Sequence, residues 1–135
     1  GSVVHNGCTI SVEEIGTLKP GQKISFIMDT RLCPAVYDLA KNADLMICES
    51  TFLADEKDKA KKYGHLTVDQ AAQIAKTAQV RQLVLTHFSG RHLSAEQYQH
   101  AAEKIFPGTL VARDGDQIEI RRPRRLSENR KFFRV

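Results

Sequence analysis

Three short apolar runs alternate along the chain with segments that carry helix signals. The runs cover residues 23–28, 44–48 and 82–86, and a polar side chain follows each of them. Runs of this length between polar or turn-forming residues are typical of buried β-strands. Because their apolar residues are continuous rather than alternating, the strands are expected to be covered on both faces, as in a parallel sheet.

The segments between the expected strands carry helix start and stop signals. The predicted helices cover residues 35–41, 68–78 and 94–105. The first is opened by Pro34 and closed by Asn42 as its C-cap. The other two begin at candidate capping boxes, at residues 67–70 and 94–97. A charged stretch, residues 55–62, is expected to be an exposed helix or a mobile loop.

One Asn-Gly and one Asp-Gly turn signal lie near the two ends of the chain. Asn6-Gly7 lies between short apolar stretches, and Asp114-Gly115 separates residues 109–112 from residues 117–120. The second signal predicts a terminal β-hairpin. The whole alternation predicts an α/β fold with mostly parallel strands, flanking helices and that hairpin. We expect one domain over residues 1–122, followed by a basic tail over residues 123–135.

The composition is that of an ordinary globular protein. The chain has 135 residues, of which 41% are hydrophobic and 27% charged, so disorder is not expected and one domain is. No apolar run approaches the length that spans a membrane. The three cysteines, Cys8, Cys33 and Cys48, are odd in number and form no CxxC pair. This excludes a disulfide scaffold and favours reduced thiols in a cytoplasmic protein.

The positive charge is concentrated toward the end of the chain. The formal net charge is +4, and residues 113–135 hold 8 Lys and Arg against 4 Asp and Glu. A basic stretch of this kind suits a polyanionic partner such as RNA. On charge alone, a solvated and frayed tail is an equally good interpretation.

The candidate chemistry lies where the expected strands end. Asp29, Glu49 and His87 follow the first, second and third strand, and His65 stands just before the capped helix. Parallel strands bring their carboxyl ends to one edge of the sheet, where open α/β sheets bind ligands. Carboxylates and imidazoles in one cleft suit a divalent metal ion and proton transfer.

Each of these residues also has an ordinary structural interpretation. Asp29 could cap a turn, Glu49 could be a strand-end charge, and His65 could be a loop histidine. His87 is harder to explain in this way, because it follows directly on an apolar run and therefore lies at the mouth of a core. Four such residues at one predicted edge make a purely structural interpretation of the whole set much weaker.

Several of these segments resemble one family, the ribonuclease Z enzymes of the metallo-β-lactamase superfamily. Residues 28–31, Met-Asp-Thr-Arg, resemble the family's Gly-Asp-Thr-Arg, and residues 48–52 are similar to its His-Glu-Ala-Thr-Phe block. Residues 64–67 resemble its Gly-His-Ser-Thr block, and residues 85–91 its Leu-Thr-His segment ending in Ser-Ser-Arg. The resemblance covers about residues 6–120, in the family's order and spacing.

The resemblance implies an αββα sandwich of which this chain is the C-terminal half, and a role in removing the 3′ trailer from precursor tRNA. It implies two Zn²⁺ ions, or Mn²⁺, holding a hydroxide that attacks the phosphodiester. Asp29 would bridge the ions and His87 would bind one of them. His65, oriented by Glu49, would protonate the leaving oxygen, and Arg91 would contact the substrate phosphate.

The chain also departs from the family pattern. Met28 replaces a Gly, Leu66 replaces a Ser, and Cys48 replaces the His of the His-Glu-Ala-Thr block, which puts the hydrogen bonding of that block in question. The family's His-x-His-x-Asp-His motif and a further His ligand belong to the upstream half of the domain. Asp29 and His87 are fewer ligands than the roughly six to eight that a dinuclear site needs.

The ligand shortage predicts that this chain alone binds zinc weakly or not at all and cleaves no RNA. An apolar face meant for the missing half predicts a companion chain or self-association as a homodimer. Two other functions are compatible with the sequence. One is a phosphodiesterase of the same fold that acts on cyclic nucleotides or other nucleic acids, and the other is a non-catalytic αβ module that binds RNA through residues 121–125.

Overall fold

The computed structural model describes residues 1–16, 21–91 and 94–120, which form two separate sheets. The first is a hairpin of β1 (Ser2–His5) and β2 (Cys8–Ser11), followed by the short helix α1 (Val12–Ile15). Asn6 and Gly7 form its turn with φ of 49° and 76°. Positive φ at both central residues is what a two-residue hairpin turn of the I′ type requires, so the Asn-Gly signal is confirmed.

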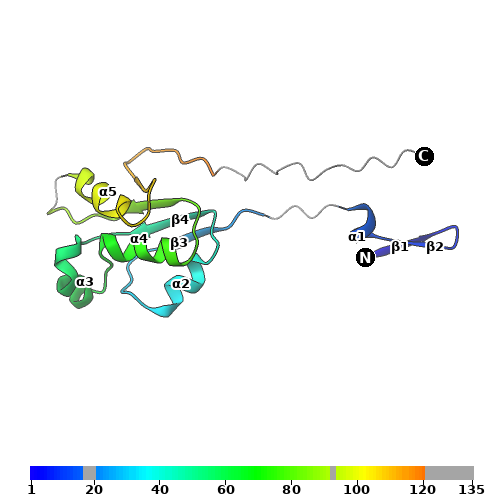
Figure 1. The fold of residues 1–135 in the computed structure, drawn as a ribbon, viewed down its shortest axis with the longest axis horizontal. Coiled ribbons are helices and arrows are strands. Elements are labelled where there is room, and N and C mark those ends of the chain that lie inside the picture. Colours follow the sequence, from blue (N-terminus) through cyan, green and yellow to red (C-terminus); the bar gives the residue numbers. More distant parts are fainter. Residues whose placement is uncertain (17–20, 92–93, 121–135) are drawn as a thin grey trace.

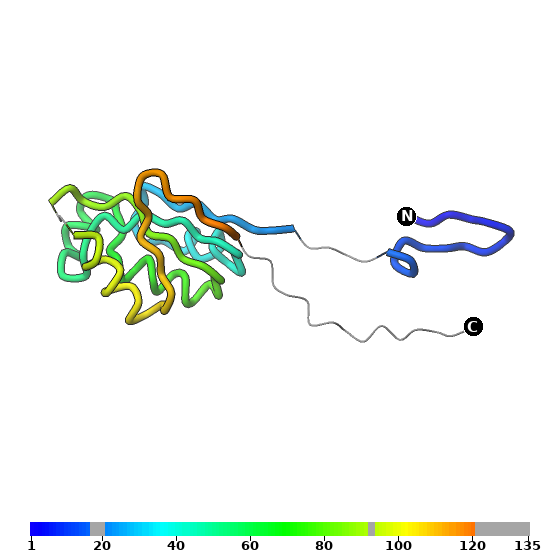
Figure 2. Tube along the Cα trace, turned by 90° about the horizontal axis from the view of Figure 1, so that it is seen from above, coloured from blue at the N-terminus to red at the C-terminus, as the bar shows by residue number. Residues whose placement is uncertain are grey.

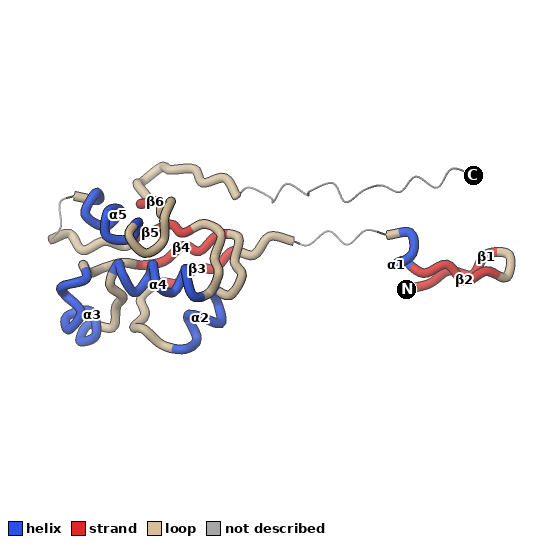
Figure 3. Tube along the Cα trace, in the orientation of Figure 1, coloured by secondary structure: helices blue, strands red, loops and turns tan. Residues whose placement is uncertain are grey.

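The second sheet is parallel and four-stranded, and it carries the rest of the fold. It consists of β3 (Ile24–Ile27), β4 (Leu45–Glu49), β5 (Leu83–Thr86) and β6 (Leu110–Val111), in that order across the sheet. All three neighbouring pairs are parallel. Figures 1 and 3 show the strands lying side by side with their helices against them. The predicted α/β class with mostly parallel strands is therefore confirmed.

Helices cover one face of this sheet. They are α2 (Pro34–Ala40), α4 (Val68–Thr77) and α5 (Ala95–Glu103). Helix α3 (Lys57–Tyr63) follows a single 3₁₀ turn at Ala54–Glu56 and packs mainly against that turn. Helix α4 is central, because it buries Ala71, Ile74 and Ala75 against Met46, Leu83 and Leu85 of the sheet. The Gln70 side chain closes the capping box by accepting from the Thr67 N–H at 3.0 Å.

The opposite face of the sheet carries a second apolar row. The strand register aligns Phe26, Ile47, Val84 and Leu110 across all four strands. No helix of the described core packs against this row. At the two edges Phe26 is 65% exposed and Leu110 41% exposed, whereas Val84 in the middle is buried. A large aromatic side chain on an edge strand is thus left facing away from the core.

The prediction of a terminal β-hairpin is wrong. Residues 109–112 do contain a strand, but β6 pairs in parallel with β5, and residues 117–120 form no strand. After the turn, in which Asp116 N–H donates to the Arg113 carbonyl, the chain runs toward the opposite edge of the sheet (Figure 2). There the Ile120 carbonyl accepts from the Gln22 amide at 2.9 Å. The pairing of β6 with β5 and this contact with Gln22 are both made with distant parts of the chain, in place of the local pairing that a hairpin would need.

Most other element boundaries lie within two residues of those predicted. The first strand ends at Ile27 rather than Met28, and Glu49 is the last residue of its strand rather than the residue after it. The charged stretch at 55–62 is helical, as one of the two expectations had it. Ser94 precedes α5, but its side chain makes no capping hydrogen bond, so the second capping box is wrong.

Two further expectations concern the periphery. The basic tail over residues 123–135 lies outside the described residues, so the predicted division of the chain stays a prediction. Within the described part of the chain, the helices are all too short or too polar to cross a membrane.

Candidate metal and phosphodiester site

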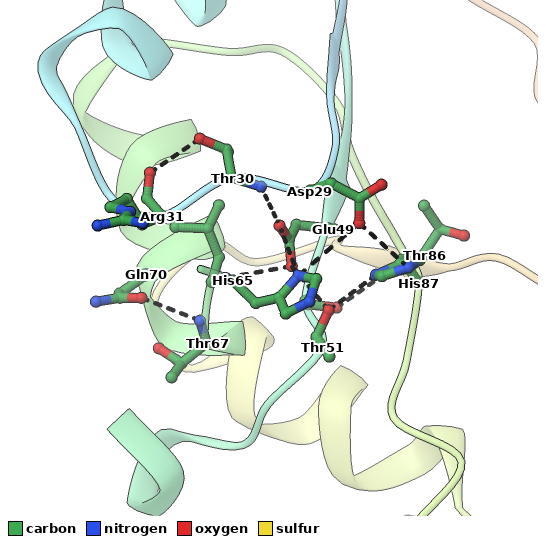
Figure 4. A network of polar contacts seen from close by, with 12 residues as sticks. Asp29, Thr30, Arg31, Glu49, Thr51, His65, Thr67, Gln70, Thr86 and His87 are labelled. Atoms are coloured by element: carbon green, nitrogen blue, oxygen red, sulfur yellow. Dashed lines mark hydrogen bonds and ion pairs between the residues drawn. The ribbon is translucent and has the colours of Figure 1, made fainter. Parts of the chain in front are cut away.

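The polar residues predicted at the strand ends do come together at the carboxyl edge of the parallel sheet (Figure 4). Asp29 follows β3, Glu49 ends β4 and His87 follows β5. Asp29 and His87 both have left-handed backbone, with φ of 46° and 57°. This conformation is uncommon for side chains other than glycine and costs on the order of 1–3 kcal/mol. The strain at both positions turns the chain sharply and directs the two side chains to the same point.

His65 reaches this point from the end of α3. Gly64, with φ of 79°, ends that helix in the left-handed conformation, and the His65 N–H donates to the Ala60 carbonyl at 2.9 Å. The following residues run parallel to the segment after β4, because Val68 N–H donates to Phe52 and Phe52 N–H to Leu66. These hydrogen bonds fix the backbone on both sides of His65, and its side chain is 23% exposed.

Glu49 is the buried centre of the site. Its side chain has no exposed surface. Its Oε1 accepts from the Thr30 N–H at 2.6 Å, and its Oε2 from the Leu66 N–H at 3.2 Å and the Thr51 hydroxyl at 2.7 Å. The His65 Nδ1 lies 3.0 Å from Oε2. A carboxylate is acceptor-only, so four donors around it satisfy its charge without a cationic partner.

Asp29, His65 and His87 form one open cluster above this carboxylate. Their candidate ligand atoms all lie within 4.8 Å of one another. The His87 Nε2 is 3.4 Å from Asp29 Oδ1, and the two imidazole rings are 5.4 Å apart between centroids. Asp29 is 71% exposed and His87 45% exposed, so the cluster opens to solvent. Carboxylate and imidazole at this spacing can hold a divalent metal ion.

Thr51 belongs to this site although sequence analysis did not single it out. Its hydroxyl lies 2.9 Å from His87 Nδ1 as well as 2.7 Å from Glu49. The only signal in the sequence is its place two residues after Glu49, which puts it beyond the end of the strand on the same edge. A threonine just after a strand is too common for that signal to identify a site residue without the structure.

Arg91 lies beside the cluster rather than in it. Its guanidinium is 5.1 Å above the centre of the Phe52 ring and 4.0 Å from Glu56 Oε1. Phe52 in turn is 6.1 Å from the His65 ring between centroids. Cation–π contact with Phe52 therefore holds Arg91 at the rim next to His65.

A basic groove opens on the other side of His65. It is lined by two short loops and the first turns of α3, through Arg31, Leu32, Lys57, Asp58, Lys61, His65 and Gln70. Three of these residues are cationic and exposed, against one exposed carboxylate. The groove is therefore an electropositive surface that leads directly to the His65 ring.

Cys48 does not disturb the site. Its side chain is fully buried in the core that faces the helices, and none of the hydrogen bonds to Glu49 involves it. Burial first, and then the neighbouring Glu49 charge, raise the pKa of the Cys48 thiol far above its ordinary value. The thiol is thus an inert apolar group, and the hydrogen bonding of this block is complete without the family's histidine.

The fold agrees with comparisons to known proteins. Residues 4–88, more than half of the chain, match the family model described as the beta-lactamase superfamily domain. The chain superimposes on the metallo-beta-lactamase fold protein YhfI from Bacillus subtilis with a TM-score of 0.63 and 28% identity, over 69% of this chain and 38% of that one. The chain belongs to the metallo-β-lactamase superfamily.

Within that superfamily, the chain is homologous to part of ribonuclease Z. It is 46% identical over 121 residues to the ribonuclease Z of Nocardia farcinica, covering 89% of this chain and 40% of the relative. Against that of Enterococcus faecalis it is 43% identical, covering 88% and 39%. The crystal structure of human tRNase Z, short form, matches with a TM-score of 0.58 and 35% identity, over 75% of this chain and 34% of that one.

The chain spans about 40% of the length of the first two of these relatives. The expected membership of the ribonuclease Z group and the expected fold are confirmed by these matches. The roles of the individual site residues are a separate matter, since no match assigns them to side chains.

The burial of Glu49 predicts the effect of removing its charge. In Glu49→Gln, the side-chain NH₂ would face at least one N–H or O–H group that now donates to a carboxylate oxygen. That hydrogen bond would be lost, so the free energy of unfolding should fall by about 1–3 kcal/mol. Urea unfolding followed by circular dichroism measures this. The exposed Glu13→Gln on α1 is the matched control and should stay within about 0.5 kcal/mol of the unmodified chain. Equal stability of the two variants would contradict the central role of Glu49.

Proposed function

We propose that this chain supplies the acid–base half of a metal-dependent endoribonuclease that removes the 3′ trailer from precursor tRNA. The observation that carries the proposal is the convergence of Asp29, His65 and His87 over the buried Glu49 carboxylate. The homology to enzymes named ribonuclease Z supports the choice of tRNA as substrate. The basic groove beside this cluster supports a negatively charged phosphodiester as substrate rather than a neutral one.

Asp29 and His87 are the residues that would hold the metal. The Asp29 Oδ1 and the His87 Nε2 lie 3.4 Å apart and are both solvent-accessible, so one cation could be bound by both atoms. The donor set fits Zn²⁺, and Mn²⁺ would also be accepted. Bound there, such an ion would activate water at neutral pH and stabilise negative charge on the phosphate.

His65 is proposed as the general acid. Its Nδ1 faces the Glu49 carboxylate and lies 3.9 Å from Asp29 Oδ1, so this nitrogen carries a proton and Nε2 is left to act on substrate. With Nδ1 held by this carboxylate, Nε2 is the atom that would give a proton to the leaving 3′-oxygen. Glu49 thus orients the acid without contacting substrate.

The RNA backbone would be held on both sides of His65. Arg91, fixed over Phe52, suits a phosphate next to the scissile bond. On the other side, the groove of Arg31, Lys57 and Lys61 suits the phosphates of the strand that ends in the leaving oxygen, since His65 protonates that oxygen. The direction of the RNA across the site follows from this placement.

The site needs further ligands that this chain does not provide. Within the described residues, the cluster offers a single carboxylate and two imidazoles, of which His65 is assigned to proton transfer. The relatives contain additional chain. We propose that the corresponding half of the domain completes the metal site and covers the apolar row ending in Phe26. In its absence, a second copy would cover the same row and form a homodimer.

Zinc binding tests the shortage of ligands. We expect the purified chain to retain less than one Zn²⁺ under non-denaturing mass spectrometry, and a protein carrying both halves to retain two. The same spectra report whether the chain is a monomer or a dimer, and Phe26→Lys should favour the monomer. Two tightly held zinc ions on the chain alone would overturn the division of the site proposed above.

The separate roles of His65 and His87 can be tested in a protein that carries both halves. His65→Ala should lower the rate of precursor-tRNA cleavage by about 10²- to 10⁴-fold, as expected on loss of a general acid, with little change in zinc content. His87→Ala should lower zinc content together with activity. His100→Ala, on an exposed position of α5, serves as the control. Loss of zinc in His65→Ala would make His65 a ligand instead.

Charge reversal tests the groove. Lys57→Glu with Lys61→Glu should weaken binding of an acceptor-stem RNA and lower the slope of log affinity against log salt by about 1 for each phosphate that is no longer neutralised. Fluorescence anisotropy over a salt series measures both effects. Lys76→Glu with Lys104→Glu carries the same charge change on exposed positions outside the groove. If both double variants behave alike, the groove has no specific role.

A further inference from the structure

Thr51 joins the two histidines of the site through one carboxylate. Its hydroxyl is 2.7 Å from Glu49 Oε2 and 2.9 Å from His87 Nδ1, while His65 Nδ1 lies 3.0 Å from that same Oε2. His87 therefore reaches Glu49 through the threonine, and His65 reaches it directly. Figure 4 shows the hydroxyl between the carboxylate and the His87 ring.

The backbone of Thr51 is fixed from two further elements. Its carbonyl accepts from the Ser89 N–H at 3.1 Å and from the Tyr98 hydroxyl of α5 at 3.2 Å. Burial is the main cause that raises the pKa of the Tyr98 phenol, so this group stays a protonated donor. The position of the Thr51 hydroxyl is consequently set by the core and not by solvent.

Counting protons gives the direction of each hydrogen bond. Backbone N–H groups of Thr30 and Leu66 donate to the two oxygens of Glu49, so both carboxylate oxygens act as acceptors. A threonine hydroxyl has one proton, and this proton must therefore be donated to Glu49. The hydroxyl then offers His87 only a lone pair, so the proton of the neutral ring must be on Nδ1.

We propose that Thr51 is a positioning residue that holds His87 in the tautomer with its lone pair on Nε2. This nitrogen is the one that lies 3.4 Å from Asp29 Oδ1. His65 then donates its Nδ1–H to Glu49 directly, and His87 donates its Nδ1–H to the Thr51 hydroxyl. The lone pair of each ring is on Nε2, where His87 would bind metal and His65 would transfer a proton. That the His87 Nε2 lone pair binds metal rests on the proposed function, whereas the tautomer of His87 does not.

The tautomer can be measured on this chain without metal. In the ¹⁵N-labelled protein at alkaline pH, where imidazoles are neutral, two-bond ¹H–¹⁵N correlation spectra distinguish protonated from unprotonated ring nitrogens. His65→Gln and His87→Gln assign the signals. We expect His87 to carry its proton on Nδ1 in the unmodified chain and in Thr51→Ser, which keeps the hydroxyl. In the isosteric Thr51→Val, the His87 signals should shift toward the Nε2–H tautomer, while those of His65 should not move.

Two results would overturn the proposal: an unprotonated Nδ1 of His87 in the unmodified chain, or an unchanged Nδ1–H tautomer in Thr51→Val. If Thr51→Val does not fold, the spectra of the unmodified chain and of Thr51→Ser decide the question. In a protein carrying both halves, Thr51→Val should lower zinc affinity by about 10- to 100-fold and Thr51→Ser should not. A tautomer shift without a change in zinc affinity would leave the positioning role intact and remove His87 from the proposed metal site.

Discussion

The buried carboxylate of Glu49 is the interaction on which the rest of the site depends. An ionised group without solvent exposure is stable only when donors surround it, and three segments supply them here: the loop after β3, the residues just after β4, and the His65 and Leu66 pair before α4. Each segment is thereby held to the others by charge-assisted hydrogen bonds. The same interaction that stabilises the fold at this edge also sets the orientation of His65.

Strained backbone at Asp29 and His87 also shapes the site. Asp29 and His87 both leave their strands in the left-handed conformation, and at both positions a non-glycine residue accepts that cost. If β3 and β5 continued in register, Asp29 and His87 would share one row of the sheet but stand two strands apart, on the order of 10 Å. The sharp turns instead bring a carboxylate and an imidazole within 3.4 Å. Rigid strands with strained ends are a common way to fix functional groups.

The two faces of the sheet differ in how they are covered. One face is closed by α2, α4 and α5 over a continuous core. The other carries an apolar row of four residues whose edge members are exposed. Because a sheet of continuous apolar strands is stable when both faces are covered, the row indicates a second layer. The solvent-accessible cluster and the exposed edge residues of this row both lie on a chain that spans about 40% of the length of its relatives.

Local patterns in the sequence were sufficient for the elements and for the edge at which they meet. Apolar runs predicted β3, β4 and β5, turn and cap signals predicted α2 and α4, and parallel pairing then required Asp29, Glu49 and His87 to share one edge. These predictions depend on contacts between near neighbours in sequence or on the fixed geometry of strands. The family motifs added the ribonuclease Z assignment, which the homologues confirm.

The tertiary structure alone decided how those residues act on one another. The contacts of Glu49 with Thr30 and His65 and of Thr51 with His87 join residues 19, 16 and 36 positions apart, and no local signal specifies them. The path of residues 113–120 was decided in the same way, because β6 pairs with β5 and the Ile120 carbonyl accepts from the distant Gln22 side chain instead of forming the hairpin that Asp114-Gly115 predicts. The sequence by itself determined which groups reach the site. Long-range packing determined which of them is buried, which is exposed and which nitrogen of each histidine faces outward, because these properties depend on atoms that only the folded chain brings together.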